Sequence, residues 1–237
     1  MSFFSNLECS VPCGDERYDA RVEQHLCPRC GMPLLARYDL KAARAWKKDS
    51  LAARVPNMWR YRELMPLFDG EQPITLGEGW TPLIHATRLG AELGLERLFV
   101  KDESLNPTNS FKARGLAAAV TKASHLGAKM LSVPSAGNAA NAMAAYAAAA
   151  GIAAKVFMPK DVKVPFIREC ELYGADVTLV DGLITDAGRI AAERGAPLGW
   201  YDVSTLKEPY RIEGKKTMAY ELGEQLDWRF QIGRAHV

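Results

Sequence analysis

The sequence lacks the features that would place the protein in a membrane, in a secretory pathway or on a nucleic acid. Its first six residues have neither the basic flank nor the apolar core of a signal peptide. One alanine-rich stretch, around residues 136–154, is long and uncharged, but alanine is too weakly hydrophobic for a membrane span. With 30 basic and 28 acidic residues, the net charge of +2 is not the basic excess typical of nucleic-acid binding. We therefore expect a soluble, cytoplasmic protein that binds neither membrane nor nucleic acid.

Cysteine is scarce, and four of the five cysteines form two pairs near the N-terminus: Cys9 with Cys13, and Cys27 with Cys30. Each pair is followed by glycine, which tolerates the left-handed backbone that such a turn often needs. Four cytosolic thiols in this spacing suit a tetrahedral zinc ion, because they stay reduced. A disulfide framework, a knuckle that has lost its metal, and His25 as a substitute ligand are the alternatives.

The rest of the 237 residues follows the period of an α/β protein. Strand-like runs and helical patterns alternate along the chain, at residues 129–133, 139–150, 154–158, 165–173, 176–180 and 184–194. This alternation predicts a parallel sheet with crossover helices. Cys170 lies on the apolar side of its helix, so we expect a packed core thiol there and not a nucleophile.

Lys112 has the most informative surroundings of any residue in the chain. Residues 98–100 are typical of a short buried strand, residues 106–108 of a turn, and Ser110 of a helix N-cap. The lysine then falls in the first helical turn, where the helix dipole disfavours a further positive charge. A neutral amine is what imine formation with an aldehyde cofactor requires. An ordinary solvated lysine at a helix start is the alternative.

A second loop of the same kind follows a predicted strand, and its residues are Ser135, Ala136, Gly137 and Asn138. Small residues at a strand-to-helix turn let backbone N–H groups approach an anion, which the helix dipole also favours. An amino-acid carboxylate would fit this loop. The side chain of Asn138 can in addition hydrogen-bond a planar ring oxygen. A plain capped turn is the alternative.

These motifs resemble those of the threonine synthase family, whose members are pyridoxal-phosphate enzymes of fold type II, similar to the tryptophan synthase β subunit. The resemblance covers residues 9–228 and is carried by four segments, at residues 76–83, 100–103, 110–112 and 134–138. It implies that Lys112 is the catalytic lysine that binds pyridoxal 5'-phosphate. It also implies that Asn138 contacts the cofactor's 3′ oxygen and that residues 135–138 bind the substrate carboxylate. Two departures are visible: Asn109 replaces a usual glycine, which would narrow the approach to the lysine, and Ala113 replaces a frequent aspartate.

The resemblance implies a lyase that converts O-phospho-L-homoserine and water to L-threonine and phosphate, in threonine biosynthesis. The expected partner is a small amino-acid substrate, with a homodimer when the protein is full length. Some threonine synthases carry a similar N-terminal ribbon, which favours this activity over that of a threonine or serine dehydratase, a lyase on the same scaffold. A non-catalytic, zinc-binding fragment is the third reading.

The end of the chain predicts a truncated protein. Residues 213–222 resemble the family helix that leads towards a glycine-rich loop for the cofactor phosphate, but the sequence stops first. We expect four segments: a zinc-ribbon-like segment at 1–40, linker helices at 41–75, an incomplete catalytic region at 76–231 and a foreign tail at 232–237. Such a fragment should be inactive, with Val156, Phe157 and Leu179 left on uncovered strand faces.

Overall fold

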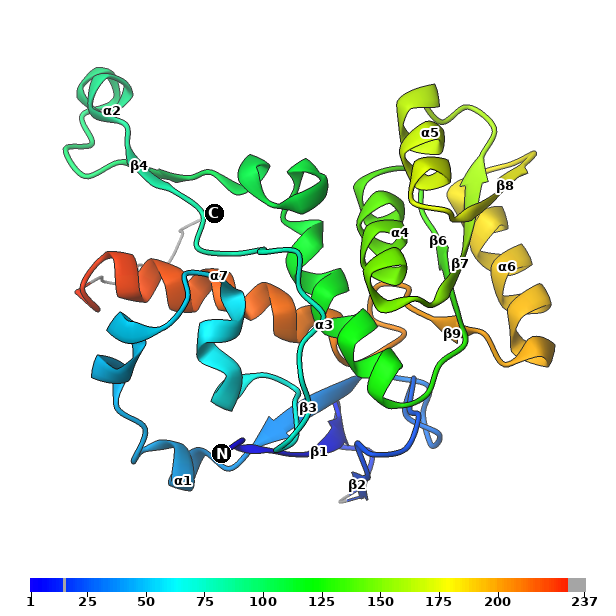
Figure 1. Ribbon diagram of the computed structural model, residues 1–237, viewed down its shortest axis with the longest axis horizontal. Helices are drawn as coiled ribbons and strands as arrows, with labels where there is room; N and C mark the ends of the chain where they lie inside the picture. Colours follow the sequence, from blue (N-terminus) through cyan, green and yellow to red (C-terminus); the bar gives the residue numbers. More distant parts are fainter. Residues whose placement is uncertain (15, 230–237) are drawn as a thin grey trace.

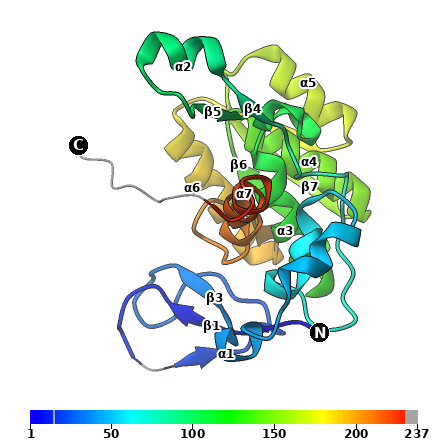
Figure 2. The same ribbon diagram turned by 90° about the vertical axis from the view of Figure 1, so that its left-hand side faces the viewer.

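The computed structural model describes residues 1–14 and 16–229, so the predicted foreign tail at 232–237 lies outside the described residues. An antiparallel ribbon of three strands lies at one end of the molecule, and a hairpin with a short helix lies at the other (Figures 1 and 2). An α/β region (residues 112–225) lies between them. Within the described part of the chain, no helix is both long enough and apolar enough to cross a membrane.

The ribbon (residues 1–38) has the strand order β2-β1-β3, with β1 at Phe4–Cys9, β2 at Arg17–Tyr18 and β3 at Leu34–Tyr38. Phe4 and Leu7 of β1 and Leu34 of β3 are buried together in one small core, and a register shift between Phe4 and Asn6 interrupts the alternation of side chains along β1. Tyr210 of the α/β region belongs to the same small core. The ribbon is therefore fixed to the α/β region by packing.

Short helices connect the ribbon to the remainder of the chain. Helix α1 (Leu40–Ala43) begins after Asp39, whose carboxylate accepts two backbone N–H groups of the first turn. Two 3-10 helices follow, η1 (Lys48–Ala53) and η2 (Met58–Leu64). The basic side chains at positions 41, 44, 47 and 48 are exposed to solvent.

The hairpin consists of β4 (Leu83–His85) and β5 (Phe99–Lys101), which pair antiparallel and are connected through α2 (Thr87–Leu93). The prediction of a buried strand at residues 98–100 was wrong, because Val100 is 46% exposed and its neighbour Ile84 is 49% exposed. An apolar triplet indicates a strand, but it does not indicate which layers cover that strand.

The main sheet is parallel, as predicted. Its strand order is β8-β7-β6-β9, from β6 (Met130–Pro134), β7 (Ala153–Pro159), β8 (Asp176–Val180) and β9 (Tyr201–Asp202). Figure 1 shows α4 (Asn138–Ala150) and α5 (Val164–Leu172) on one face and α6 (Ile184–Gly195) on the other. A short 3-10 helix, η5 (Ala196–Leu198), follows α6. Both faces of a parallel sheet are covered in this arrangement.

Two side chains that we expected on uncovered strand faces are buried. Val156 and Phe157 have no exposed surface, because α4 and α6 cover β7 from its two sides, and only Leu179 is 44% exposed. Cys170 is fully buried, and its Sγ lies 3.3 Å from the side-chain oxygen of Asn141. The prediction of a core thiol is confirmed.

Helices α3 (Lys112–His125) and α7 (Arg211–Gln225) cross where each carries a glycine. Two short 3-10 helices, η3 (Glu103–Leu105) and η4 (Pro107–Asn109), precede α3. A Cβ atom added to Gly214 would lie 1.9 Å from the backbone oxygen of Arg114. One added to Gly115 would lie 2.9 Å from the backbone oxygen of Arg211. The two backbones touch at a point where side chains would separate them. This contact brings the start of α7 beside the start of α3.

Candidate functional site

Lys112 is the first residue of α3 and follows the turn that contains η4. The Oγ atom of Ser110 accepts its backbone N–H at 3.3 Å, although the residue in the N-cap position is Phe111. The lysine side chain is half-buried, and this burial, followed by the nearby charge of Arg211, lowers the pKa of Lys112. The amine is therefore easier to deprotonate than a surface lysine, with burial as the main cause.

The turn before Lys112 explains the asparagine that departs from the family pattern. Thr108 and Asn109 have φ angles of 56° and 51°, so both residues adopt the left-handed conformation. Glycine adopts this conformation freely, and asparagine is among the few other residues that adopt it at low cost. Asn109 therefore preserves the backbone path to the lysine, although it adds a side chain there.

The loop at residues 135–138, which we call the anion loop, lies between β6 and α4, and its Asn138 is the first residue of α4. The backbone N–H of Ser135 donates to Phe157 of the neighbouring strand at 3.0 Å, which fixes the start of the loop. The Oγ atom of Ser135 lies 3.4 Å from the backbone nitrogen of Gly137. The first amides of α4 have no partner inside their own helix and lie at the positive end of its dipole. This end of α4 can receive a carboxylate.

Lys112 and the anion loop lie at the same end of the molecule. Helices α3 and α4 pack against each other, and α4 also contacts the turn at η4. In Figure 1 both helices begin at the upper end of the α/β region and run downwards side by side. The fold therefore presents an amine and a helix N-terminus from two adjacent elements, as the sequence predicts for residues 112 and 135–138.

Two further cations near Lys112 were missed by the sequence analysis. Arg211 is 2% exposed, and its Nη1 donates to the backbone oxygen of Val203 at 2.6 Å. Its Nε and Nη2 are buried and have no hydrogen-bond partner among the described residues. Burial, followed by the charges of Arg211 and Lys112, lowers the pKa of Lys215. The Nζ atoms of Lys112 and Lys215 lie 4.7 Å and 5.8 Å from the ring centroid of Phe111.

We call Lys112, Arg211 and Lys215 the basic cluster. Arg211 and Lys215 lie in the first two turns of α7, at the positive end of its dipole, where further positive charge is unfavourable. Glu208 is the nearest compensating group on this segment, but its two oxygens accept the backbone N–H groups of Tyr210 and Arg211 at 2.8 Å. Burial raises the pKa of Glu208 to about 7, so it carries a full charge only in alkaline solution. The charges of Glu208 and Asp202 favour the charged form of Arg211, but among the described residues neither carboxylate accepts a hydrogen bond from its guanidinium.

The four N-terminal cysteines meet at the end of the ribbon, in the arrangement that the sequence predicts. Their sulfur atoms all lie within 4.8 Å of one another, with Cys9 and Cys30 at 3.5 Å and Cys13 and Cys27 at 3.5 Å. These distances exceed a disulfide bond and approach the ~3.8 Å between ligands of a tetrahedral zinc ion with bonds of about 2.3 Å. The hydroxyl of Tyr18 lies 3.4 Å from the Cys27 sulfur. His25 is not part of this cluster.

Comparison with known proteins places the chain in a family. The model of the family described as "pyridoxal-phosphate dependent enzyme" matches residues 74–233, which include Lys112, the anion loop and the start of α7. The chain belongs to the pyridoxal-phosphate dependent enzymes. A threonine synthase of Methanosarcina acetivorans is 34% identical over 225 residues, which are 94% of this chain and 54% of that protein. One of Synechocystis is 40% identical over 176 residues, 71% of this chain and 45% of that protein.

The solved structures that this pyridoxal-phosphate dependent enzyme resembles are also longer chains, and the match covers about half of each. Threonine deaminase isoform 2 of Solanum lycopersicum is 28% identical with a TM-score of 0.55, over 61% of this chain and 40% of that one. A diaminopropionate ammonia lyase of Escherichia coli, at 18% identity and a TM-score of 0.59, covers 96% of this chain and 55% of that one, and it shows the fold. The chain spans about half the length of the relatives it matches.

The residues of this family member fit two parts of the cofactor. An aldehyde needs a neutral amine, and burial lowers the pKa of Lys112 in that sense. A ring oxygen needs a donor at the edge of the site, and Asn138 is exposed at the start of α4. For the cofactor's phosphate and ring nitrogen we assign no partner within residues 1–14 and 16–229. The fit is therefore to the reactive edge of the cofactor.

A buried ion network, also missed by the sequence analysis, fixes α3 to α7 and to the hairpin. The guanidinium of Arg114 is fully buried and donates to both oxygens of Glu103 and both oxygens of Glu221 at 2.6–2.8 Å. Burial alone would raise the pKa of Glu221, but hydrogen bonds and charge from Arg114 outweigh it, and the net shift is downward. Lys101 of β5 lies 2.9 Å from the same carboxylate. This network is structural, because its charges are balanced.

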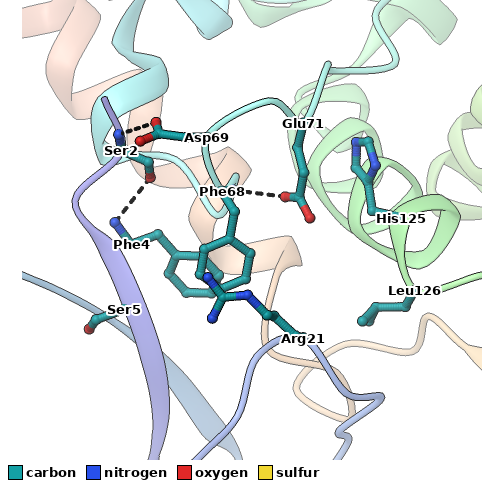
Figure 3. Close-up of a pocket in the computed structure, with 9 residues that line it drawn as sticks. All are labelled: Ser2, Phe4, Ser5, Arg21, Phe68, Asp69, Glu71, His125 and Leu126. Carbon is teal, nitrogen blue, oxygen red and sulfur yellow. Dashed lines mark hydrogen bonds between the residues drawn. The ribbon is translucent and has the colours of Figure 1, made fainter.

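A cavity of about 680 Å³ lies where β1, the loop at residues 68–71 and the end of α3 meet, away from Lys112 (Figure 3). Its polar groups are mostly committed to one another. Glu71 binds Lys122 at 3.0 Å and accepts the backbone N–H of Phe68, and His125 binds the backbone oxygen of Gln72 at 2.8 Å. Arg21 lies with its guanidinium 3.9 Å from the ring centroid of Phe68. We assign no chemistry to this cavity.

Proposed function

We propose that the chain carries the amino-terminal part of a threonine synthase whose substrate is O-phospho-L-homoserine. The observation that carries the proposal is the basic cluster, because Arg211 and Lys215 add positive charge beside the reactive lysine, and two nitrogens of the Arg211 guanidinium have no described hydrogen-bond acceptor. A phosphate ester brings about two negative charges near neutral pH. Threonine and serine have no phosphate group, so a site built for them would use these two cations only if the cofactor's own phosphate lay beside them.

The roles of the residues follow from their positions. The amides at 135–138 hold the substrate carboxylate at the start of α4, which orients Cα towards Lys112. Lys215 and Arg211 bind the phosphate and stabilise the charge that grows as the Cγ–O bond breaks. Lys112, whose burial makes the amine easier to deprotonate, removes protons at Cα and Cβ and delivers protons to Cγ and back to Cα. A water oxygen forms the new bond at Cβ, and inorganic phosphate departs.

Pyridoxal phosphate, when bound, supplies the electron sink that makes these proton transfers feasible. Lys112 would hold its aldehyde carbon and Asn138 its ring oxygen. Borohydride reduction of the chain with the cofactor, followed by peptide mapping, tests the first assignment, and Lys112→Ala should abolish the label. Label on Lys101 or Lys122 would overturn it. Both of these lysines are committed to carboxylates in the fold, so they serve as internal controls.

The substrate class is tested with the protein extended to its natural stop codon, by measuring phosphate release from O-phospho-L-homoserine and ammonia release from threonine. We expect phosphate release. Ammonia release alone would favour the second candidate, a threonine deaminase-type lyase. The similarity to a solved threonine deaminase is the observation in favour of this candidate. The chain as written should show no turnover, because the described residues hold only one edge of the cofactor.

We further propose that the four cysteines hold one zinc ion with a structural role. All four ligand positions are filled by protein sulfur, and a closed tetrahedral site of this kind stabilises a fold and leaves no open position for a substrate. Metal analysis after exhaustive dialysis should return one zinc ion per chain. A value near zero in protein prepared with zinc in the medium would contradict the proposal.

A further inference from the structure

A second cavity, of about 360 Å³, lies where the ribbon meets the open edge of the parallel sheet. Glu23, His25 and Leu26 line it from the ribbon, and the end of α6 and strand β9 line it from the α/β region. Ligand sites of proteins span roughly 300–1,000 Å³, so this cavity suits a small metabolite. Domain contacts of this kind are frequent places for such sites.

The floor of this cavity is apolar. Ala191, Ala192 and Gly195 at the C-terminal end of α6 line it together with Trp200. A Cβ atom on Gly195 would lie 3.1 Å from the Trp200 ring, so glycine lets the indole approach the helix. Such a floor accepts a hydrocarbon side chain and offers it no hydrogen bond.

The rim carries an acid and a base that keep free capacity. Oδ1 of Asp202 accepts the backbone N–H of Ser204 at 2.8 Å and also binds its hydroxyl. Oδ2 of Asp202 lies 4.0 Å from Nζ of Lys207, which is beyond hydrogen-bond distance. The Lys207 side chain is 48% exposed and that of Asp202 is 29% exposed. Each can therefore bind a ligand group of opposite charge.

His25 lines the same cavity, and Glu23 fixes its ring. Its Nε2 lies 2.8 Å from a carboxylate oxygen of Glu23, which leaves Nδ1 for another partner. Nδ1 is buried and has no hydrogen-bond partner within residues 1–14 and 16–229. The hydroxyl of Tyr201, whose ring lies 5.0 Å from the imidazole between centroids, is also buried without a described partner, but Tyr201 does not line the cavity.

We propose that this cavity binds a free α-amino acid with an apolar side chain. The ligand's carboxylate would pair with Lys207, its ammonium group with Asp202, and its side chain would lie on the alanine and tryptophan floor. A simple organic anion would face Asp202 and Glu23, and a simple amine would face Lys207. A zwitterion with a hydrocarbon side chain is the chemistry that satisfies the rim and the floor together.

This site is separate from the reaction site. It is built by Asp202 and Lys207 on one side and by the ribbon on the other, whereas the reaction site is built by the starts of α3, α4 and α7. The proposal therefore does not depend on the assignment of Lys112. It makes the ribbon part of a binding site in addition to its structural role.

Isothermal titration of the cofactor-free chain with leucine, valine and phenylalanine tests the proposal, with glutamate, lysine, N-acetyl-leucine and leucinamide as comparison ligands. We expect the apolar amino acids to bind and the four comparison ligands to bind at least tenfold more weakly. Equal binding of N-acetyl-leucine or leucinamide would overturn the assignment of a zwitterion. Failure of all apolar amino acids to bind at millimolar concentration would overturn the site.

Variants separate this cavity from the anion loop, which can also bind a carboxylate. Lys207→Met and Asp202→Asn should each weaken binding at least tenfold, and Ala192→Trp should block it by filling the floor. Lys160→Met is the matched control, because Lys160 makes an exposed ion pair of 3.0 Å with Asp181 elsewhere. Ser135→Ala should leave binding unchanged. Binding that survives Ala192→Trp and is lost in Ser135→Ala would place the ligand in the anion loop and refute the proposal.

Discussion

Two buried arginines beside the crossing of α3 and α7 differ in whether carboxylates pair with their positive charge. Arg114 is fully buried and has both oxygens of two carboxylates as acceptors. Arg211 is 2% exposed, yet it has a single backbone acceptor and two donors without a described partner. Burial of a charge is costly unless the charge is paired. The balanced arginine therefore serves the fold, and the unbalanced one indicates a place for an anion from outside.

The four N-terminal cysteines give the same comparison for negative charge. Removing the zinc ion that would neutralise them has the largest expected effect on stability. Four thiolates within 4.8 Å repel one another unless a cation neutralises them. Removing zinc should unfold the ribbon, since structural zinc contributes on the order of 10 kcal/mol in small domains. Cys27→Ser should do the same. The measurement is the amide spectrum by NMR, in which signals of residues 4–38 should collapse while those of α3 and α4 persist.

A ribbon that keeps its signals after chelation would show that its small core suffices without metal. Full zinc retention in Cys27→Ser would point to a different ligand set, with His25 as the nearest candidate in sequence. Cys170→Ser is the matched control. Its thiol is buried in the core of the α/β region and lies outside the cluster, so zinc content should not change.

Arg114→Met tests the balanced arginine. The substitution keeps much of the volume but leaves Glu221, which has no exposed surface, without its main partner. We expect a loss of about 3–5 kcal/mol in the free energy of unfolding, the usual result when one partner of a buried ion pair is removed. Urea denaturation measures it. A loss below about 1 kcal/mol would mean that Lys101 alone compensates the carboxylate.

Arg211→Met tests the unbalanced arginine in the same way and should give the opposite pattern. Stability should be unchanged or slightly higher, because no buried carboxylate loses a hydrogen bond from this guanidinium. Affinity for inorganic phosphate should fall at least tenfold, which corresponds to about 1.4 kcal/mol. Titration followed by phosphorus NMR measures it, with Arg114→Lys as a control for general disturbance of the helix crossing. Unchanged phosphate affinity would remove the main support for a phosphorylated substrate.

The smallest expected effect is on the pKa of Lys112. Burial and then the charge of Arg211 lower this pKa, so removing the charge in Arg211→Met should raise it partway towards the ordinary value. A raised pKa leaves less neutral amine at a given pH, so the rate of cofactor attachment should fall and its rise with pH should move to higher pH. Absorbance of the bound cofactor against pH measures both. A shift to lower pH would contradict the sign.

Much of the fold could be predicted because its signals are local. The strand expected at residues 129–133 and the helix expected at 165–173 match β6 (Met130–Pro134) and α5 (Val164–Leu172) to within one residue at each end, and alternation along the chain predicted a parallel sheet. The placement of Lys112 at a helix start followed from the preceding turn. Assignments of Lys112, Asn138 and the four cysteines to cofactor and metal stay predictions. The covering of Val156 and the exposure of Val100 could not be predicted, because both depend on which layers pack against a strand.

Arg211 and Lys215 were missed because they lie about a hundred positions from Lys112 in the sequence. Only the tertiary contact between Gly115 and Gly214 brings them near. One local signal was available: two cations in the first two turns of a predicted helix oppose its dipole, and such an arrangement is unusual unless an anion binds there. Lys207 and Asp202 gave no comparable signal, because surface ion pairs of this spacing are common.

The glycine contact between α3 and α7 has a consequence for transplanting the site. Where side chains separate two helices, their spacing changes whenever the side chains change, but here main-chain atoms set the spacing. The backbone contact therefore sets the separation between Lys112 and Arg211, and changes of side chains elsewhere in the core should not alter it. A designer who copies the first two turns of each helix, with both glycines, into an unrelated scaffold should recover the pair of cations at its native spacing.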